Sequence, residues 1–546
     1  MVSAPTRGRK TEQNPECLGE ADVTSRSASP EVSPAAVTCA MHEIYLINPA
    51  ENAPGYFGLE VLGAWTGVNA TAIADLATPT VAAFAPDNWK VTICEERLDP
   101  VDFSHPARYV GITGKVTQQA RMIELAAEFR RRGKIVLIGG SYASLSPDAL
   151  REHCDILVIG EIEEIAGELF EDLALGKYKS TYQGGKPALV DSPVPRWDLY
   201  PLERTWSAQV QTSRGCPFDC EFCDVIQYLG RKQRWKEPDQ ITAELDILRD
   251  RGVRGVFFAD DNLTVMRRRT RALLERLLDW NTRPPDERLA FATQVSIDIS
   301  RDHDILALMR NSGFETLFVG IETPNEQSLA EAGKRQNLRH DMIAQVETIV
   351  QHGMMVYGGI IVGFDQDGVD IFERQFDFIQ SMPLPLISPG VLVAPETTPL
   401  HTRLLKEGRL TEGSDHSASL ISTNIIPAQM SKEQLRSGMT WLLNRLFAPS
   451  HFMTRLERYV ALSGERKDFQ RQALFAGPTA LLARELVKRG PAEYALVRAF
   501  DRASVDRPDL VVSLTTIFSL YCQARHMLEV QDLWQPDLAR FERPAL

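Results

Sequence analysis

The sequence predicts an α/β protein that begins with a doubly wound parallel sheet, continues as a partial (β/α)6 barrel and ends in a helical region. Two series of short apolar runs carry this prediction, because each run alternates with an amphipathic helical pattern. Such alternation is typical of parallel sheets covered by helices. Beyond about residue 430 the strand patterns fade, and runs such as 440–447 and 479–489 have helical spacing.

The first series predicts a flavodoxin-like domain over residues 42–180. Its β-like runs are 43–49, 90–94, 108–114, 134–140 and 155–160. The segment 117–132 between two of these runs has the spacing of an amphipathic helix. Doubly wound sheets bind ligands at the carboxyl ends of their strands. Residues 1–41, rich in Ser, Pro and Thr without periodicity, are predicted to be a disordered leader.

The second series predicts a barrel over residues 206–428, with its chemistry at the carboxyl rim of the strands. Its β-like runs are 208–213, 255–261, 290–296, 316–322, 355–364 and 386–395. A proline-containing linker over 181–205 precedes the barrel, and a C-terminal helical domain over 429–546 follows it.

Bulk properties exclude several classes of protein. The formal charge of −13 argues against a general nucleic-acid binder, which would carry a basic surface. No apolar run is long enough to predict a transmembrane helix, and no secretory signal is recognisable. Three of the eight cysteines fall within eight residues, which indicates metal binding in a reducing compartment. We therefore expect a cytoplasmic protein.

The strongest motif is a C-x3-C-x2-C run directly after the first barrel strand, formed by Cys216, Cys220 and Cys223. Three thiolates on one short loop can hold three irons of a cubane and leave the fourth iron open to a small molecule. The alternative is a structural zinc loop, which requires four ligands. No fourth cysteine or histidine lies nearby, since the next histidine is His303. The motif favours a [4Fe–4S] cluster.

This motif resembles the signature of the radical S-adenosylmethionine (SAM) superfamily. Further segments resemble one subgroup, which has an N-terminal cobalamin-binding domain and a C-terminal helical extension and includes hopanoid methylases. These segments are 230–236, 257–262, 293–299, 318–329, 334–337 and 358–367. The resemblance implies three cofactors, namely a [4Fe–4S] cluster, SAM and cobalamin. It also implies that SAM bound at the open iron is cleaved to a 5′-deoxyadenosyl radical.

Four polar residues end successive barrel strands and are expected at the same rim as the cysteines: Asp260, Asp261, Gln294 and Glu322. The resemblance implies that they hydrogen-bond SAM. For the two aspartates, capping of the following helix is the alternative. No catalytic side chain is assigned.

The basic run that follows the cysteines has two interpretations. Arg234 is a candidate for binding the SAM carboxylate or an anionic substrate. For Arg231, Lys232 and Lys236 we favour an exposed basic loop.

Small and polar residues end the strands of the N-terminal sheet, where the resemblance implies cobalamin contacts. These residues are Thr113, Gly139, Gly140, Ser141, Gly160 and Glu161. Many cobalamin modules carry D-x-H-x-x-G after the first strand, whereas residues 48–58 contain no histidine. We therefore expect no imidazole ligand to cobalt, with Tyr56 or a water in its place. A sheet that has lost its cofactor is one alternative. A dinucleotide site is disfavoured because no G-x-G-x-x-G follows the first strand.

The resemblance implies methyl transfer to a carbon atom of a lipid or secondary metabolite. The partners expected are this small-molecule or lipid substrate and an electron donor such as flavodoxin or ferredoxin, while peripheral contact with a membrane stays open. One alternative is a cobalamin-dependent radical cyclase or rearrangement enzyme. The other is a cobalamin-binding sensor without catalysis, which would not need the cysteine motif.

Overall fold

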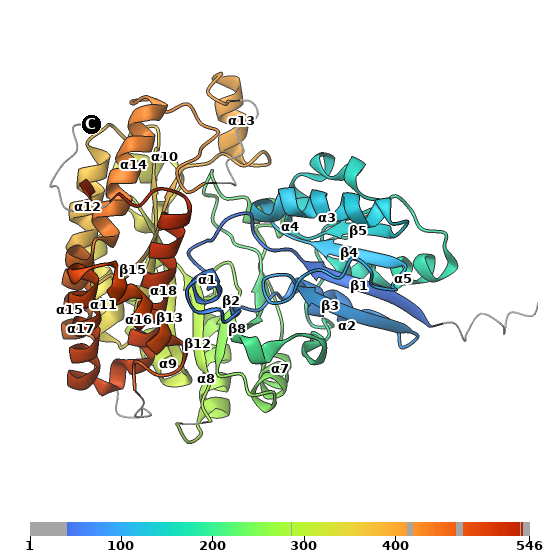
Figure 1. Ribbon diagram of the computed structural model, residues 1–546, viewed down its shortest axis with the longest axis horizontal. Coiled ribbons are helices and arrows are strands. Elements are labelled where there is room, and N and C mark those ends of the chain that lie inside the picture. Colours follow the sequence, from blue (N-terminus) through green and yellow to red (C-terminus); the bar gives the residue numbers. More distant parts are fainter. Residues whose placement is uncertain (1–40, 286, 412–418, 466–472, 536, 539–546) are drawn as a thin grey trace, which may run out of the picture. The chain divides into compact units, whose positions relative to one another are not determined.

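The computed structural model describes residues 41–546 except 286, 412–418, 466–472, 536 and 539–546 (Figure 1). Nearly all of the predicted leader, residues 1–40, therefore lies outside the described residues. Residues His42–Leu546 form one compact unit, which contains both predicted sheets.

The N-terminal sheet has six parallel strands in the order β3-β1-β4-β5-β6-β7. These are β1 (His42–Asn48), β3 (Trp89–Glu95), β4 (Tyr109–Thr113), β5 (Ile135–Gly139), β6 (Ile156–Ile159) and β7 (Thr181–Gln183). Strand β1 pairs with β3 on one side and with β4 on the other, and β5, β6 and β7 follow β4 in sequence. This is the flavodoxin-like order. The predicted architecture is confirmed. The short edge strand β7 was not predicted.

Two apolar cores lie on opposite faces of this sheet, because successive side chains of a strand alternate between faces. Tyr45 and Ile47 of β1 pack with four buried residues of helix α3 (Gln119–Arg131). Ile44 and Leu46 pack instead with helix α5 (Ala166–Leu175). The helix predicted over 117–132 is thus confirmed.

The second sheet has seven parallel strands in the order β15-β14-β13-β12-β11-β8-β2. The six predicted ones are β8 (Thr205–Val210), β11 (Gly255–Phe258), β12 (Ala290–Val295), β13 (Phe314–Glu322), β14 (Met355–Val362) and β15 (Leu386–Val391). The seventh, β2 (Thr71–Ile73), belongs in sequence to the predicted N-terminal domain but pairs with β8 (Figure 1). Three residues are too few to show a periodic pattern, so the sequence could not reveal it.

Helices cover the outer face of this curled sheet. They include α7 (Pro238–Asp250), α8 (Arg267–Asn281), α9 (His303–Ser312), α11 (Met342–Gln351) and α12 (Ile371–Gln380). The C-terminal region adds α14 (Lys432–Phe447), α15 (Pro449–Leu462), α16 (Pro478–Leu486), α17 (Pro491–Asp506) and α18 (Val511–Val530). None of the helices that the structure describes is long and apolar enough to cross a membrane.

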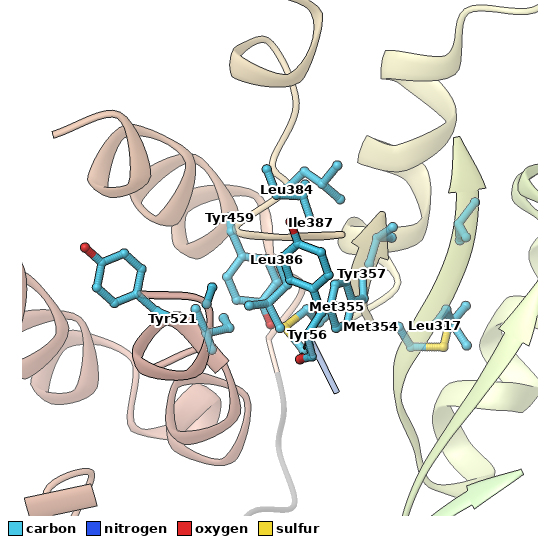
Figure 2. Packing of buried hydrophobic residues seen from close by; sticks show 14 of the residues in the cluster. Tyr56, Leu317, Met354, Met355, Tyr357, Leu384, Leu386, Ile387, Tyr459 and Tyr521 are labelled. Carbon is cyan, nitrogen blue, oxygen red and sulfur yellow. Dashed lines mark hydrogen bonds between the residues drawn. The ribbon is translucent and has the colours of Figure 1, made fainter. Parts of the chain in front are cut away.

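The C-terminal helices share one apolar core with the barrel. Figure 2 shows Tyr459 of α15 and Tyr521 of α18 in the same cluster as Leu386 and Tyr357 of the barrel sheet. Tyr56, from the loop after β1, belongs to the same core. The helical region therefore packs on both the barrel and the N-terminal part of the chain.

Gln523 of α18 fixes the segment that leads from β1 into the barrel. Its side-chain oxygen accepts from the backbone N–H of Val61 (3.0 Å), and its amide donates to the carbonyl of Gly55 (2.9 Å) and to Glu60 (2.5 Å). Gln523 is fully buried, so no water can replace these bonds.

We predict that Gln523→Leu destabilises the protein by about 1–3 kcal/mol, because it leaves buried backbone groups without hydrogen bonds. The measurement is chemical unfolding followed by circular dichroism. Ser519→Ala on the same helix is the matched control. Its hydroxyl is buried and has no hydrogen-bond partner among the described residues, so its removal should cost nothing measurable. Equal stability of the two variants would contradict the prediction.

Candidate active site

The cysteine loop leaves the carboxyl end of β8 and folds back on itself. A two-stranded antiparallel ladder of β9 (Ser213–Arg214) and β10 (Arg234–Trp235) closes its base. The backbone N–H of Cys216 donates to the carbonyl of Gly230 (3.2 Å). Gly215 has φ +98°, and a Cβ there would lie 2.8 Å from the carbonyl oxygen of Lys232. Only glycine fits this crossing of the loop ends.

The three cysteines of the loop lie within electrostatic reach of one another. Cys220 is buried, while Cys216 and Cys223 are half-buried. Burial, together with Asp224 and the thiolates of Cys220 and Cys216, raises the pKa of Cys223 to about 12. Bound iron would offset this cost, because it is the thiolate that ligates metal. The donor set therefore fits an iron–sulfur cluster.

The described residues contain no group of three His, Cys, Asp or Glu side chains that could hold one metal ion. A cubane is held differently, because each thiolate binds a different iron.

Asp260 and Asp261 brace the strand that leads into the cysteine loop. Asp260 is fully buried and accepts from the hydroxyls of Thr212 (2.7 Å) and Ser213 (2.5 Å). Asp261 accepts from the backbone N–H of Gly215 (2.7 Å). Burial raises the pKa of each carboxyl to about 6. Neither aspartate caps α8, whose N-cap residue is Met266.

Gln294 and Glu322 end their strands on the barrel side of the site. Gln294 is half-buried near the end of β12. Glu322 is buried, has φ +65° and pairs with Lys334 (Oε1 to Nζ, 2.6 Å). Positive φ is rare outside glycine. Here the side chain of Asn337 helps to fix the strand end by donating to the carbonyls of Gly320 and Ile321. Contacts of Gln294 and Glu322 with SAM stay a prediction.

One cavity of about 720 Å³ joins the ends of the N-terminal sheet to the barrel rim. Its lining includes every residue predicted at the strand ends of the sheet: Thr113, Gly139, Gly140, Ser141, Gly160 and Glu161, together with Tyr56. From the barrel side, Gln211, Arg214 and Asp261 line the same cavity. The cavity thus adjoins the loop that carries the cysteines.

The glycines at the strand ends allow close backbone packing. Gly140 has φ +94°, and a Cβ there would lie 2.7 Å from Thr113 Oγ1. At Gly160, with φ +80°, a Cβ would lie 2.5 Å from the carbonyl oxygen of Gly184. These clashes are with the protein itself, so both glycines are required by the loops that form the cavity wall.

Tyr56 lines the cavity, but its ring and hydroxyl are buried in the apolar core. The residue is 8% exposed, and its hydroxyl has no hydrogen-bond partner among the described residues. Its ring stacks on Phe447 of α14, with centroids 6.3 Å apart. Burial raises its pKa well above the usual value, so the hydroxyl stays protonated. None of the cavity-lining residues that the structure describes is a histidine.

Glu161 links the sheet to the cysteine loop. Its carboxylate accepts from Arg214 (2.5 Å) and, through both oxygens, from Arg234 (2.8 and 2.6 Å). Arg214 and Arg234 face each other across the β9–β10 ladder. The guanidinium of Arg234, predicted as a possible anion binder, is therefore engaged by protein groups. A contact of Glu161 with cobalamin stays a prediction.

The basic run only partly matches the exposed loop that we expected. Arg231 and Lys232 are exposed. Lys236 is instead buried and pairs with Glu244 (3.0 Å). The expectation was wrong for Lys236 because its backbone N–H donates to the carbonyl of Thr212 directly after β10, and its side chain packs against α7 through Glu244.

Lys334 and Arg214 were not predicted as site residues, although Lys334 lies in the segment 334–337 and Arg214 stands two residues before Cys216. A charged residue beside a glycine in a motif is a weak signal by itself. Glu161, the partner of Arg214, lies 53 residues away, and Glu322, the partner of Lys334, lies 12 residues away on another element.

Comparison with known proteins identifies the family. Residues 210–378 match the model of the radical SAM superfamily, and residues 398–495 match a domain of unknown function, DUF4070. Residues 210–378 are therefore a radical SAM domain. The match includes the cysteine loop, the two bracing aspartates, Glu322 and Lys334.

Two relatives of the chain are named as a methyltransferase and a methylase. The chain is 34% identical over 64% of its length to an uncharacterized methyltransferase of Synechocystis sp.. It is 32% identical over 62% of its length to the hopanoid C-2 methylase of Rhodopseudomonas palustris. The alignment spans 66% of each relative, just under two thirds.

A solved structure supports the architecture. The cobalamin-dependent radical SAM enzyme OxsB, solved with aqua-cobalamin bound, superposes with a TM-score of 0.57 at 14% identity. The superposition covers 90% of this chain and 81% of OxsB. At this identity the likeness establishes the fold alone, and it confirms the predicted order of sheet, partial barrel and helical region.

We predict that the anaerobically reconstituted protein holds about four irons and four sulfides, the content of one cubane. Replacing Cys216, Cys220 and Cys223 together by alanine should abolish iron binding, as measured by iron and sulfide analysis. Cys154→Ala is the control, because that buried thiol donates to the carbonyl of Leu150 and lies outside the loop. Full iron content in the triple variant would refute the assignment.

Proposed function

We propose that this chain is a cobalamin-dependent radical SAM methyltransferase that places a methyl group on a carbon of a lipid or secondary metabolite. The observation that carries the proposal is the single cavity shared by the sheet ends and the barrel rim. A substrate radical must be kept from water and must reach its methyl donor without leaving the site. A single cavity shared by the two binding regions meets the second need, because the radical and its methyl donor lie in one space.

The chain offers a separate binding region for each cofactor. Cys216, Cys220 and Cys223 would hold the cluster, with Asp260 and Asp261 fixing the loop. Gln294 and Glu322, at the ends of neighbouring strands, would contact SAM. When bound, the cluster supplies an electron to SAM and cobalamin supplies a transferable methyl group.

The sheet side of the cavity suits a large ligand with an apolar part. Its wall there is apolar and lies between the sheet and α5. The residues of this wall include Ile44, Leu46, Leu137, Val158, Leu169, Phe170 and Leu173. Thr113, Ser141 and the backbone at Gly139 and Gly140 supply polar groups at the strand ends. This division of apolar and polar groups supports cobalamin as the ligand.

The names of the two relatives favour methyl transfer over cyclisation or rearrangement. A sensor role has no need of a cluster-binding loop. We propose a flavodoxin or ferredoxin as the electron donor, because the reaction takes up electrons that the chain does not supply.

We predict that the purified protein binds hydroxocobalamin and that no protein nitrogen ligates the cobalt, because the described lining of the cavity contains no histidine. Electron paramagnetic resonance of the reduced Co(II) form should lack the axial nitrogen splitting. Tyr56→Phe should alter this spectrum if the tyrosine lies at the lower face. A clear nitrogen triplet from the protein would contradict the prediction, and failure to bind cobalamin would reject this part of the proposal.

We predict that cells fed methyl-deuterated methionine make a metabolite that carries one labelled methyl group and disappears when the gene is deleted. The measurement is mass spectrometry of extracts from the deleted and complemented strains. Complementation with the triple cysteine variant is the control and should not restore the metabolite. A missing metabolite whose structure differs by a ring or rearrangement, with no labelled methyl, would favour the alternative reaction.

A further inference from the structure

The segment that carries Lys334 lies directly against the cysteine loop. The backbone N–H of Glu221 donates to the carbonyl of Ala332 (3.1 Å). Gly333 has φ +74°, and a Cβ there would lie 3.1 Å from the carbonyl oxygen of Asp219 and 3.7 Å from Cys220 Cα. The next residue, Lys334, is thus fixed beside the loop by backbone contacts.

Lys334 and Glu322 form a buried ion pair at this place. Their side chains are 14% and 7% exposed, and Nζ lies 2.6 Å from Oε1. Gly320 leaves the space that the pair fills, since a Cβ there would lie 2.7 Å from Nζ and 2.4 Å from Oε1. Charges this far from solvent are weakly screened by salt.

The Lys334 ammonium affects the pKa of the Cys220 thiol more strongly than the Glu322 carboxylate does. Burial raises the pKa of Cys220, Lys334 lowers it, and Glu322 raises it by a smaller amount. Burial opposes the charge of Lys334 in turn, but Glu322 and the thiolates of Cys220 and Cys223 raise its pKa above the usual value. Lys334 is therefore charged, and its backbone neighbours place it beside the cysteine loop.

We propose that Lys334 is the counter-ion of the cysteine loop and that, together with Glu322, it sets the reduction potential of the cluster. This inference rests on the cluster of the proposed function but not on methyl transfer. Reduction takes one electron from a low-potential donor and adds one negative charge to a cluster that three thiolates already make anionic. A fixed buried cation stabilises that added charge, and net charge is among the factors that set cluster potentials.

The test is a potentiometric titration of the reconstituted full-length protein without SAM. Dithionite is the one-electron donor, and electron paramagnetic resonance measures the reduced cluster. Lys334→Met should make the potential more negative, because it removes the cation. Glu322→Gln should make it less negative, because the anionic cluster keeps the unpaired ammonium protonated. Shifts of opposite sign from two partners of one pair cannot arise from loss of packing alone.

Two further variants complete the design. Lys232→Met removes an exposed lysine from the same loop and should leave the potential unchanged, because solvent screens its charge. Lys334→Arg keeps the charge and should stay near the wild-type potential. If Lys334→Met fails to take up iron, Glu322→Gln and Lys334→Arg still decide the question.

Two results would overturn the role of Lys334. One is an unchanged reduction potential in variants that contain the cluster, and the other is a shift of the same sign for Lys334→Met and Glu322→Gln. Absence of any cluster in the wild-type protein would instead refute the cluster assignment within the proposed function.

Discussion

The site depends on the ion pairs between Glu161 and the two arginines of the β9–β10 ladder. Glu161 follows the last residues of β6, while Arg214 immediately precedes the glycine that opens the cysteine loop. Both arginines are nearly buried, with side chains 13% and 11% exposed. A buried charge that loses its partner is costly. The carboxyl ends of the N-terminal sheet and the cysteine loop are therefore held at one separation, and this separation defines the cavity between them.

Most of the fold was predictable because parallel sheets leave a strong pattern in the sequence. Each strand buried on both faces reads as an apolar run, and eleven such runs gave strands of the structure. In the two parallel sheets, the strands that were not predicted are β2 and β7, which have three residues each. β2 also joins the barrel sheet from the other side of the predicted domain boundary. Its pairing with β8 is set by tertiary packing, which no local pattern records.

The site was predictable to the extent that its chemistry is local. The cysteines share one loop, and the strand-end residues follow recognisable strands. The partners that define the electrostatics are separated by long stretches of chain. Asp260 and Thr212 are 48 residues apart, and Glu161 and Arg234 are 73 apart. The sequence shows the type of such a residue but not its partner. Glu161 and Arg234 were therefore predicted as two independent ligand candidates and not as partners of one ion pair.

The loop after β1 shows how the helical region contributes to the site. This loop lacks the histidine of many cobalamin modules, and its course is fixed by Gln523, which lies 468 residues from Gly55. The stacking of Tyr56 on Phe447 adds a second contact with the C-terminal helices. Together these contacts hold the segment around Tyr56 against the C-terminal helices, where it lines the cavity. The C-terminal helices therefore help to build the cavity, because they hold in place the segment that stands where many cobalamin modules carry a histidine.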